Sequence, residues 1–167
     1  MALKIIRRGY ELLVTCANYL QSPLLLAIRV YFFWQLFLSG KGKLENIEKV
    51  TQFFAGLGIP LPDLNARFVG ALECFGSLFI IAGLFSRPIA LMVFISMCVA
   101  YLTADMEAVS QIISDPDKFI KADPFVYWLA ALIILAFGPG LLSLDALLKN
   151  LLRRRDFGDT DASGKLS

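Results

Sequence analysis

Two charged residues lie inside long apolar runs, where a charge is costly. Arg29 interrupts the run that begins at Pro23, and Glu73 is the one charge in the run over residues 68–85. An ionisable side chain near the centre of a bilayer costs about 2.5–3.5 kcal/mol, so it normally faces other helices and has a partner. These two residues are therefore the first candidates for a polar site.

Glu73 lies on a strip of small residues. Gly70 and Gly76 are three positions away on either side, so all three share one face of a helix. Small residues let a second helix approach closely, which would bring a cation on that helix within reach of the carboxylate. The candidate partners near the first apolar run are Lys43, Lys41 and Arg29.

Two clusters follow if the charged residues meet at the ends of the helices. The outer cluster is a candidate intramembrane polar site made of Lys43, Glu73, Thr103, Glu107 and, reaching up from below, Arg29. The inner cluster joins Arg29 or Arg87 to Asp145 in structural ion pairs. An alternative interpretation applies to both, because buried ion pairs can also serve only to fix the register of helices.

Absent residue types exclude several kinds of chemistry. The chain has no histidine, which excludes a bis-histidine haem, a histidine-bound metal and a histidine proton relay. Its three cysteines, Cys16, Cys74 and Cys98, are isolated, whereas thiol–disulfide exchange needs a paired dithiol. The sequence therefore predicts no metal site and no cofactor motif, and it leaves any catalytic residue unknown.

The elements that would position these residues are membrane-spanning helices. Hydrophobic residues make up 57% of the chain and charged residues 18%, against about 45–50% and 25% in soluble domains. The apolar runs approach the roughly 20 residues needed to cross a bilayer, and the last two have no polar face. The pattern predicts an all-α integral membrane four-helix bundle, with spans at about 22–39, 66–85, 88–105 and 124–138.

Amphipathic helices are predicted to flank this domain of residues 22–145. Residues 1–21 have apolar side chains at helical spacing, which favours an interfacial helix that ends before a first span beginning at Ser22-Pro23. A shorter amphipathic piece occurs in the first loop, and residues 143–152 form another, capped by Ser143. The polar residues 153–167 are predicted to be a disordered cytoplasmic tail.

The charged residues indicate an orientation in the membrane and argue against a nucleic-acid partner. The side that would hold both termini carries more Lys and Arg than the other, so both termini are predicted to be cytoplasmic. A net charge of +2 is too small to indicate a nucleic-acid partner. The lipid bilayer is the expected environment, and the oligomeric state stays open.

Several short motifs occur in an order that resembles the DoxX family of four-helix membrane proteins. They are Arg29, 40–44 (GKGKL), 54–62 (FAGLGIPLP), 70–73 (GALE), 83–87 (GLFSR) and 138–145 (GPGLLSLD). The resemblance covers about residues 22–150. Its motif positions with ionisable side chains are Arg29, Lys43, Glu73, Arg87 and Asp145.

The resemblance implies a bacterial or archaeal inner-membrane protein linked with redox and sulfur metabolism. One related branch is a subunit of thiosulfate:quinone oxidoreductase, and mycobacterial members are placed in a complex with a superoxide dismutase and a sulfurtransferase. It therefore implies a redox partner protein of sulfurtransferase or dismutase type. It does not imply one reaction for the whole family.

Three functions remain open on the sequence. The first is an accessory or docking subunit of a redox system that binds quinone or lipid. The second is a small proton-coupled transporter that uses Glu73, by analogy with other membrane carboxylates. The third is a scaffold whose charges only orient its helices.

Overall fold

All regular secondary structure is helical in the part of the chain that the computed structural model describes, residues 2–151, with side-chain surroundings from residue 7 onward. The helices are α1 (Ala2–Glu45), α2 (Ile47–Gly56), α3 (Pro62–Ala71), the π-helix η1 (Leu72–Gly76), α4 (Ser77–Ala82), α5 (Ser86–Thr103), α6 (Met106–Ser110), α7 (Pro116–Lys121) and α8 (Pro124–Phe137). Residues 144–151 are also helical. The predicted all-α class is confirmed.

Three helical stretches are long and apolar enough to cross a membrane. They are Arg7–Glu45 of α1, the continuous Pro62–Ala82 formed by α3, η1 and α4, and all of α5. The apolar helix α8 has 14 residues, or about 21 Å at 1.5 Å per residue, which is shorter than a hydrocarbon core of about 30 Å. The chain is a multi-pass membrane protein by these criteria, with three candidate spans.

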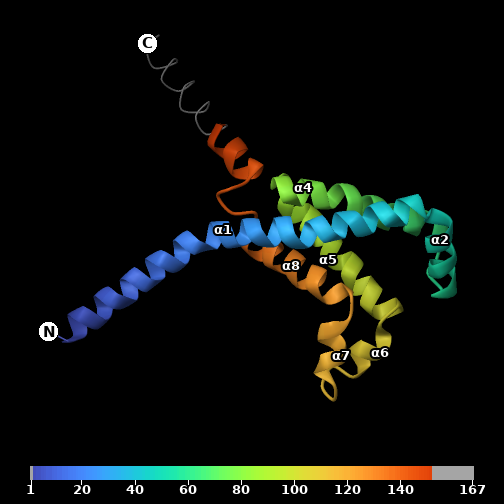
Figure 1. Cartoon of the computed structure of the whole chain (residues 1–167), viewed down its shortest axis with the longest axis horizontal. Coiled ribbons are helices and arrows are strands. Elements are labelled where there is room, and N and C mark those ends of the chain that lie inside the picture. The colour runs from blue at the N-terminus through green and yellow to red at the C-terminus, as the bar shows by residue number, and fades with distance from the viewer. Residues whose placement is uncertain (1, 152–167) are drawn as a thin grey trace, which may run out of the picture.

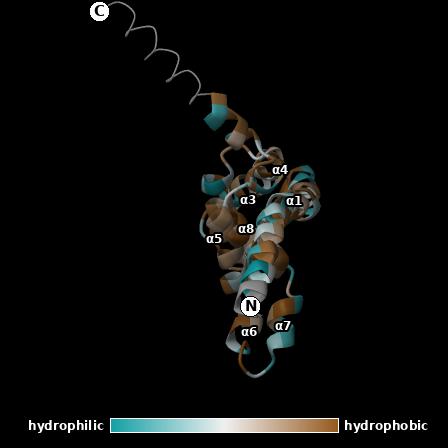
Figure 2. Cartoon of the chain, turned by 90° about the vertical axis from the view of Figure 1, so that its left-hand side faces the viewer, coloured by the Kyte–Doolittle hydropathy of each residue, from teal (hydrophilic) through white to brown (hydrophobic). Residues whose placement is uncertain are grey.

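The bundle is built around α1, which lies against α3, η1, α4 and α8, while α5 packs along α8 (Figure 1). Fully buried apolar side chains from these helices form one core. They are Phe33, Leu36, Ile80, Val93 and Ile134. Large apolar side chains of α5 and α8 are also exposed, as expected for helices in contact with lipid, and the ribbons of these helices are mostly in the hydrophobic colours of Figure 2.

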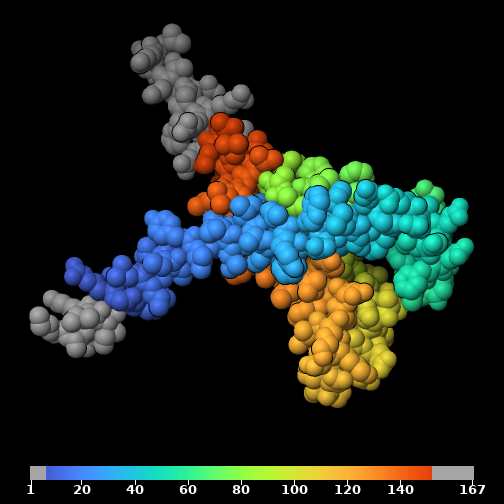
Figure 3. Space-filling model, in the orientation of Figure 1, coloured from blue at the N-terminus to red at the C-terminus, as the bar shows by residue number. Residues whose placement is uncertain are grey.

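The two ends of the bundle differ. The described ends of the chain both leave the bundle on one side, whereas α2 and the pair α6–α7 lie toward the other (Figure 1). We call the latter the α2 end. The first half of α1 extends from the bundle as an arm, without packing against the other helices (Figure 3). This arrangement places Glu73 between the two ends, on the second long helical stretch.

Helix α1 runs through Pro23 without ending. This differs from the expected helix start at Ser22-Pro23, because an interior proline removes one backbone hydrogen bond and bends a helix but does not always stop it. α1 changes direction where the arm joins the bundle (Figure 1). The arm and the first span are therefore parts of one continuous helix, and Pro23 is not a boundary between two helices.

The chain turns sharply after α8. Gly138 and Gly140 have φ values of +77° and +79°, which favour glycine because larger residues are strained there. Ser143 Oγ then accepts a hydrogen bond from the Ala146 amide at 3.2 Å, the geometry of a helix N-cap. The predicted disordered tail, residues 153–167, lies outside the described residues.

Candidate ligand-binding cleft

An ion pair between Glu73 and Lys43 joins the second helical stretch to the end of α1. The hydroxyl of Ser39, one turn before Lys43, donates a hydrogen bond to the other carboxylate oxygen of Glu73 at 3.2 Å. The side chain of Glu73 is 2% exposed and that of Lys43 is 31% exposed. The carboxylate is thus buried inside the bundle, while the lysine side chain remains partly exposed.

The backbone at Glu73 is not regular. Residues 72–76 form a π-helix, an insertion that often occurs at functional sites. α1 crosses this turn at Gly40, where an added Cβ would overlap Cys74 N and lie 2.7 Å from the Cβ of Glu73. Only glycine permits this approach, which places Ser39 and Lys43 beside the carboxylate.

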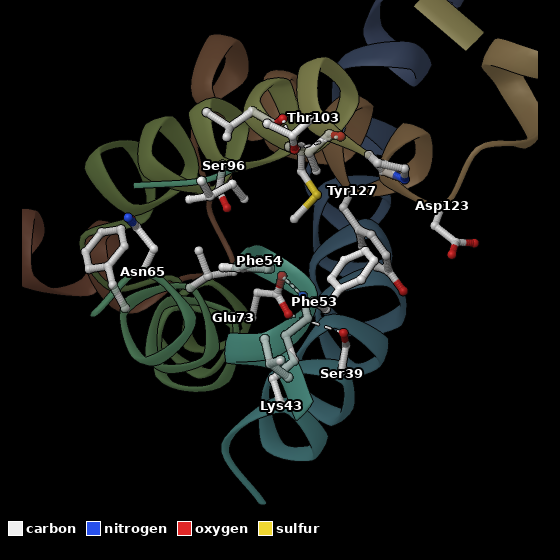
Figure 4. A pocket seen from close by; sticks show the side chains of 18 of the residues that line it. Ser39, Lys43, Phe53, Phe54, Asn65, Glu73, Ser96, Thr103, Asp123 and Tyr127 are labelled. Carbon is white, nitrogen blue, oxygen red and sulfur yellow. Dashed lines mark hydrogen bonds and ion pairs between the residues drawn. The ribbon is translucent and has the colours of Figure 1, made fainter. Parts of the chain in front are cut away.

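A cavity of about 680 Å³ opens next to this ion pair. Its walls come from five parts of the fold, namely the end of α1, α2, α3 with η1, α5, and the start of α8 (Figure 4). Most of the lining is apolar. The apolar and aromatic side chains include Leu36, Val50, Phe53, Phe54, Phe68, Met92, Ile95, Met97 and Val99.

Besides the ion pair and Ser39, the polar side chains that line the cavity are Lys49, Asn65, Ser96, Thr103, Asp123 and Tyr127. Ser96 and Thr103 of α5 lie on the wall opposite Glu73 (Figure 4). The Thr103 hydroxyl donates to the backbone carbonyl of Val99 at 2.8 Å, so its own hydrogen is already used. Asp123 lies at the rim with its carboxylate pointing away from the cavity (Figure 4). The ion pair is therefore the main polar feature of the interior.

Glu107 does not line the cavity. α5 ends at Thr103, and the chain turns at Asp105 before α6, so the helical face that would have carried Glu107 to Glu73 is interrupted. Glu107 instead forms an exposed ion pair with Lys118 at 2.8 Å. The hydrogen bond from Lys118 and its positive charge lower the pKa of Glu107. The hydrogen bond to Glu107 in turn raises the pKa of Lys118. This pair belongs to the α6–α7 surface.

Arg29 lies far from the cavity, at the other end of the bundle. It is fully buried, and it donates a hydrogen bond to the backbone carbonyl of Leu142. Its guanidinium packs so closely on Gly83 that a Cβ there would overlap Nη1. Among the described residues, Nε and Nη1 have no hydrogen-bond partner. Arg29 thus ties α1 to the turn after α4 and to the segment after α8.

Asp145 and Arg87 lie at the same end as Arg29 but bond to the backbone. The carboxylate of Asp145 accepts hydrogen bonds from the amides of Phe85 and Ser86 at 3.0 and 3.2 Å, which caps the start of α5. Arg87 Nη2 reaches the carbonyl of Ala136 near the end of α8, at 3.4 Å. Within residues 7–151, the carboxylate of Asp145 forms no ion pair with either arginine.

The described residues contain no group of three or more His, Cys, Asp or Glu side chains that could hold a metal ion. The cysteines are free, with Cys74 buried, Cys98 half-buried and Cys16 exposed. What the site offers is a mostly apolar volume beside the ion pair of Lys43 and Glu73 and the Ser39 hydroxyl, with Lys49, Asn65, Ser96 and Thr103 elsewhere on its wall. Such a site suits an apolar molecule with a small polar group.

The structure adds two features that the sequence did not indicate. The aromatic side chains of α2 form one wall of the cavity, and their spacing alone predicted only an amphipathic piece. The π-helix is the other feature, since no residue pattern distinguishes it from ordinary helix. The close approach at Gly40 could have been predicted from the glycines of the motif GKGKL, because a glycine inside an apolar helix often marks a close approach of another helix.

The fold and the site define the class of protein, a multi-pass helical membrane protein with an apolar cavity between its helices. Residues 24–106 match the model of the DoxX family, and the chain belongs to this family. No curated protein matches the chain. No solved structure matches it either.

Proposed function

We propose that this DoxX-family protein is an accessory membrane subunit of a redox or sulfur-metabolism system, and that it binds a quinone or another lipid in the cavity. The observation that carries the proposal is the cavity itself. A volume of about 680 Å³ lies in the usual range of about 300–1,000 Å³ for small-molecule sites. Its lining combines mostly apolar side chains with a polar corner at Lys43 and Glu73, as an amphipathic ligand requires.

The polar corner is suited to a quinone carbonyl. Lys43 has three N–H donors and uses one for Glu73, and its 31% exposure leaves the ammonium accessible. A carbonyl or hydroxyl on the ligand can accept from Lys43. The isoprenoid chain of the ligand would then lie along the apolar walls made by α2, α3 and α5.

The proposal includes four passes, with α8 as the fourth span and both termini cytoplasmic. An even number of passes is supported by the exit of both described chain ends at the same end of the bundle (Figure 1). α8 packs along α5, and Phe125 and Trp128 near its start suit the membrane interface. The acidic α6–α7 segment then lies on the far side. Labelling of single introduced cysteines in intact cells tests this, and labelling of both ends from outside would refute it.

Quinone binding can be measured on purified protein in nanodiscs. Short-chain ubiquinone and menaquinone analogues are titrated while the fluorescence of the native tryptophans is followed. The wild-type protein should show saturable quenching. Ser96→Phe fills the cavity from the wall opposite Glu73 and should weaken binding at least tenfold. Leu102→Phe places the same ring on the lipid-exposed side of α5, outside the cavity, and should leave binding unchanged.

Absence of saturable binding in the wild-type protein would refute the quinone part of the proposal. Equal loss in both variants would show that the binding does not occur in this cavity. The docking part needs a separate test, because the cavity does not bear on it. A pull-down from native membranes should recover a redox partner of sulfurtransferase or dismutase type, and recovery of no partner would refute it.

A second candidate function is a small proton-coupled transporter. The buried position of Glu73 beside the cavity favours it, because intramembrane carboxylates often carry protons or substrate. In proteoliposomes, Glu73→Gln would then abolish substrate flux driven by a pH gradient. Flux that is unchanged by Glu73→Gln would exclude this function while leaving ligand binding in the cavity untouched.

A further inference from the structure

We infer that the cavity is a cleft open sideways to the bilayer between α3 and α5, so that its ligand enters from lipid and not from water. The ligand class that follows is an uncharged amphiphile with one flexible chain, which stays in the opening while its head lies at Ser39, Lys43 and Glu73. This inference rests on the proposed binding site and deepens it. What it adds is the path by which the ligand enters and the chemical class of the ligand, without specifying a single headgroup.

The packing of the helices creates the opening. α5 packs against η1 and α4, whereas its packing with α3 is slight. The second helical stretch and α5 are therefore close at the α4 half and separate toward the α2 end. The π-helix lies where they separate, so Glu73 is at the closed point of the wedge. The floor of the cleft is polar, and most of the residues along its open side are apolar, with Asn65 of α3 and Ser96 of α5 among them.

The side chains along the wedge are lining residues and are also exposed. Phe68 of α3 is 51% exposed and Ile95 of α5 is 53% exposed, and Met92 and Val99 are comparably open. These residues belong to two of the candidate membrane spans. Apolar side chains exposed on a membrane span face lipid. A cavity lined by them is continuous with the acyl-chain region of the bilayer.

The charge of the floor selects the head of the ligand. Lys43 pairs with Glu73, so this ion pair has no net charge, whereas Lys49 and Asp123 line the cavity elsewhere. A charged head placed at the ion pair would find no free counter-charge there, which is costly. A carbonyl or hydroxyl meets the available Lys43 and Ser39 groups without that cost. An uncharged head with hydrogen-bonding oxygens therefore fits the floor better than a phosphate or an amine.

Two other occupants would leave different signatures. A water-soluble ligand requires that the cleft open to the aqueous side, past α2. A transmembrane helix of a partner or of a second copy would fill the wedge and exclude both lipid and water. The volume of about 680 Å³ is suited to a chain and a ring, and a helix with side chains has a diameter of about 10–12 Å and continues through the whole bilayer.

The route can be tested with a fluorescent reporter in the cleft. Trp34→Phe and Trp128→Phe remove the native tryptophans, and Tyr127→Trp then places one indole on the inner wall. The full chain is reconstituted in nanodiscs of phosphatidylcholine with or without bromine on the acyl chains. A matched reporter, Leu129→Trp, lies on the lipid-exposed face of α8 outside the cleft. Iodide serves as the aqueous quencher.

Brominated lipid should quench the reporter at position 127 at least half as strongly as the one at position 129, and iodide should quench it weakly. Adding Ser96→Phe should reduce the lipid quenching at 127 by at least half and leave 129 unchanged. Strong iodide quenching with little lipid quenching at 127 would overturn the inference. Protection from both quenchers would also overturn it, because protein would then occupy the wedge.

If Tyr127→Trp does not fold, Phe68→Trp provides a second reporter on the opposite wall. No quinone is present in this experiment, so its result is independent of the quinone titration. Lipid quenching together with failed quinone binding would support the lateral opening and refute quinone as the ligand. Quinone binding without lipid quenching would support the binding site and refute entry from the bilayer.

Discussion

The two partners of the buried ion pair should differ in how much each contributes to stability. Lys43→Met leaves the carboxylate of Glu73, which is 2% exposed, with only the Ser39 hydroxyl. Glu73→Gln leaves an ammonium group on a side chain that is already 31% exposed and can turn toward the headgroups or the ligand space. Loss of the cation should therefore be the more harmful change.

The magnitudes follow from the burial of each partner. Breaking a buried pair by removing one charge costs about 3–5 kcal/mol, and exposed pairs contribute about 0–1 kcal/mol. Because Lys43 is partly exposed, we expect about 3 kcal/mol for Lys43→Met. Glu73→Gln keeps a hydrogen-bonding group of the same shape, so about 1 kcal/mol is expected. The double variant has no unpaired charge and should be more stable than Lys43→Met by about 2 kcal/mol.

The assay is reversible unfolding with SDS in mixed micelles, followed by far-ultraviolet circular dichroism, for the wild type, both single variants and the double variant. Lys41→Met, on the same helix in an exposed pair with Glu45, is the matched control and should change stability little. Equal costs of the two single variants, with an additive double variant, would refute the reasoning. That result would mean that the pair is not coupled.

Three further predictions concern packing, capping and pH. Gly40→Ala forces α1 away from the π-helix and should cost about 1–3 kcal/mol or more in the SDS assay, whereas Gly42→Ala, with nothing within 4 Å of its new Cβ, should not destabilise the protein. Asp145→Ala removes the cap of α5 and should cost about 0.5–2 kcal/mol, seen as faster hydrogen exchange in its first turn, while Asp145→Asn should retain part of the protection. Because Lys118 lowers the pKa of Glu107, the contribution of this pair is present above the unfolded pKa of Glu107 and is lost as pH falls through its folded pKa. Lys118→Ala should raise the pKa of Glu107 in a carboxyl NMR titration, and an unchanged value would contradict the pairing.

The spacing of apolar runs and charges predicted most of what positions Glu73. A carboxylate in an apolar helix needs a partner, and a strip of glycines needs a neighbouring helix, so a lysine at the end of the first span was a sound expectation. Lys43, which pairs with Glu73, was one of three candidate cations beside Lys41 and Arg29. Its role in function stays a prediction.

Other features depend on three-dimensional packing that no local pattern records. The prediction that Thr103 and Glu107 share one helical face requires an unbroken helix, but α5 ends at Thr103 and the chain turns at Asp105. Asp145 is predicted to pair with an arginine, but its carboxylate instead accepts hydrogen bonds from the amides of Phe85 and Ser86 at the start of α5. Ser22-Pro23 predicts a helix start, whereas α1 continues through Pro23, because a proline is tolerated both at the start of a helix and inside a bent one.

The cleft beside Glu73 is expected to bind an amphiphile taken from the membrane. Native mass spectrometry of protein extracted in mild detergent tests it most directly, because it needs no prior choice of ligand. The wild type and Leu102→Phe should retain a bound, uncharged, chain-bearing molecule, and Ser96→Phe should lose it. Identical bound mass in all three proteins, or no bound molecule in the wild type, would contradict the claim.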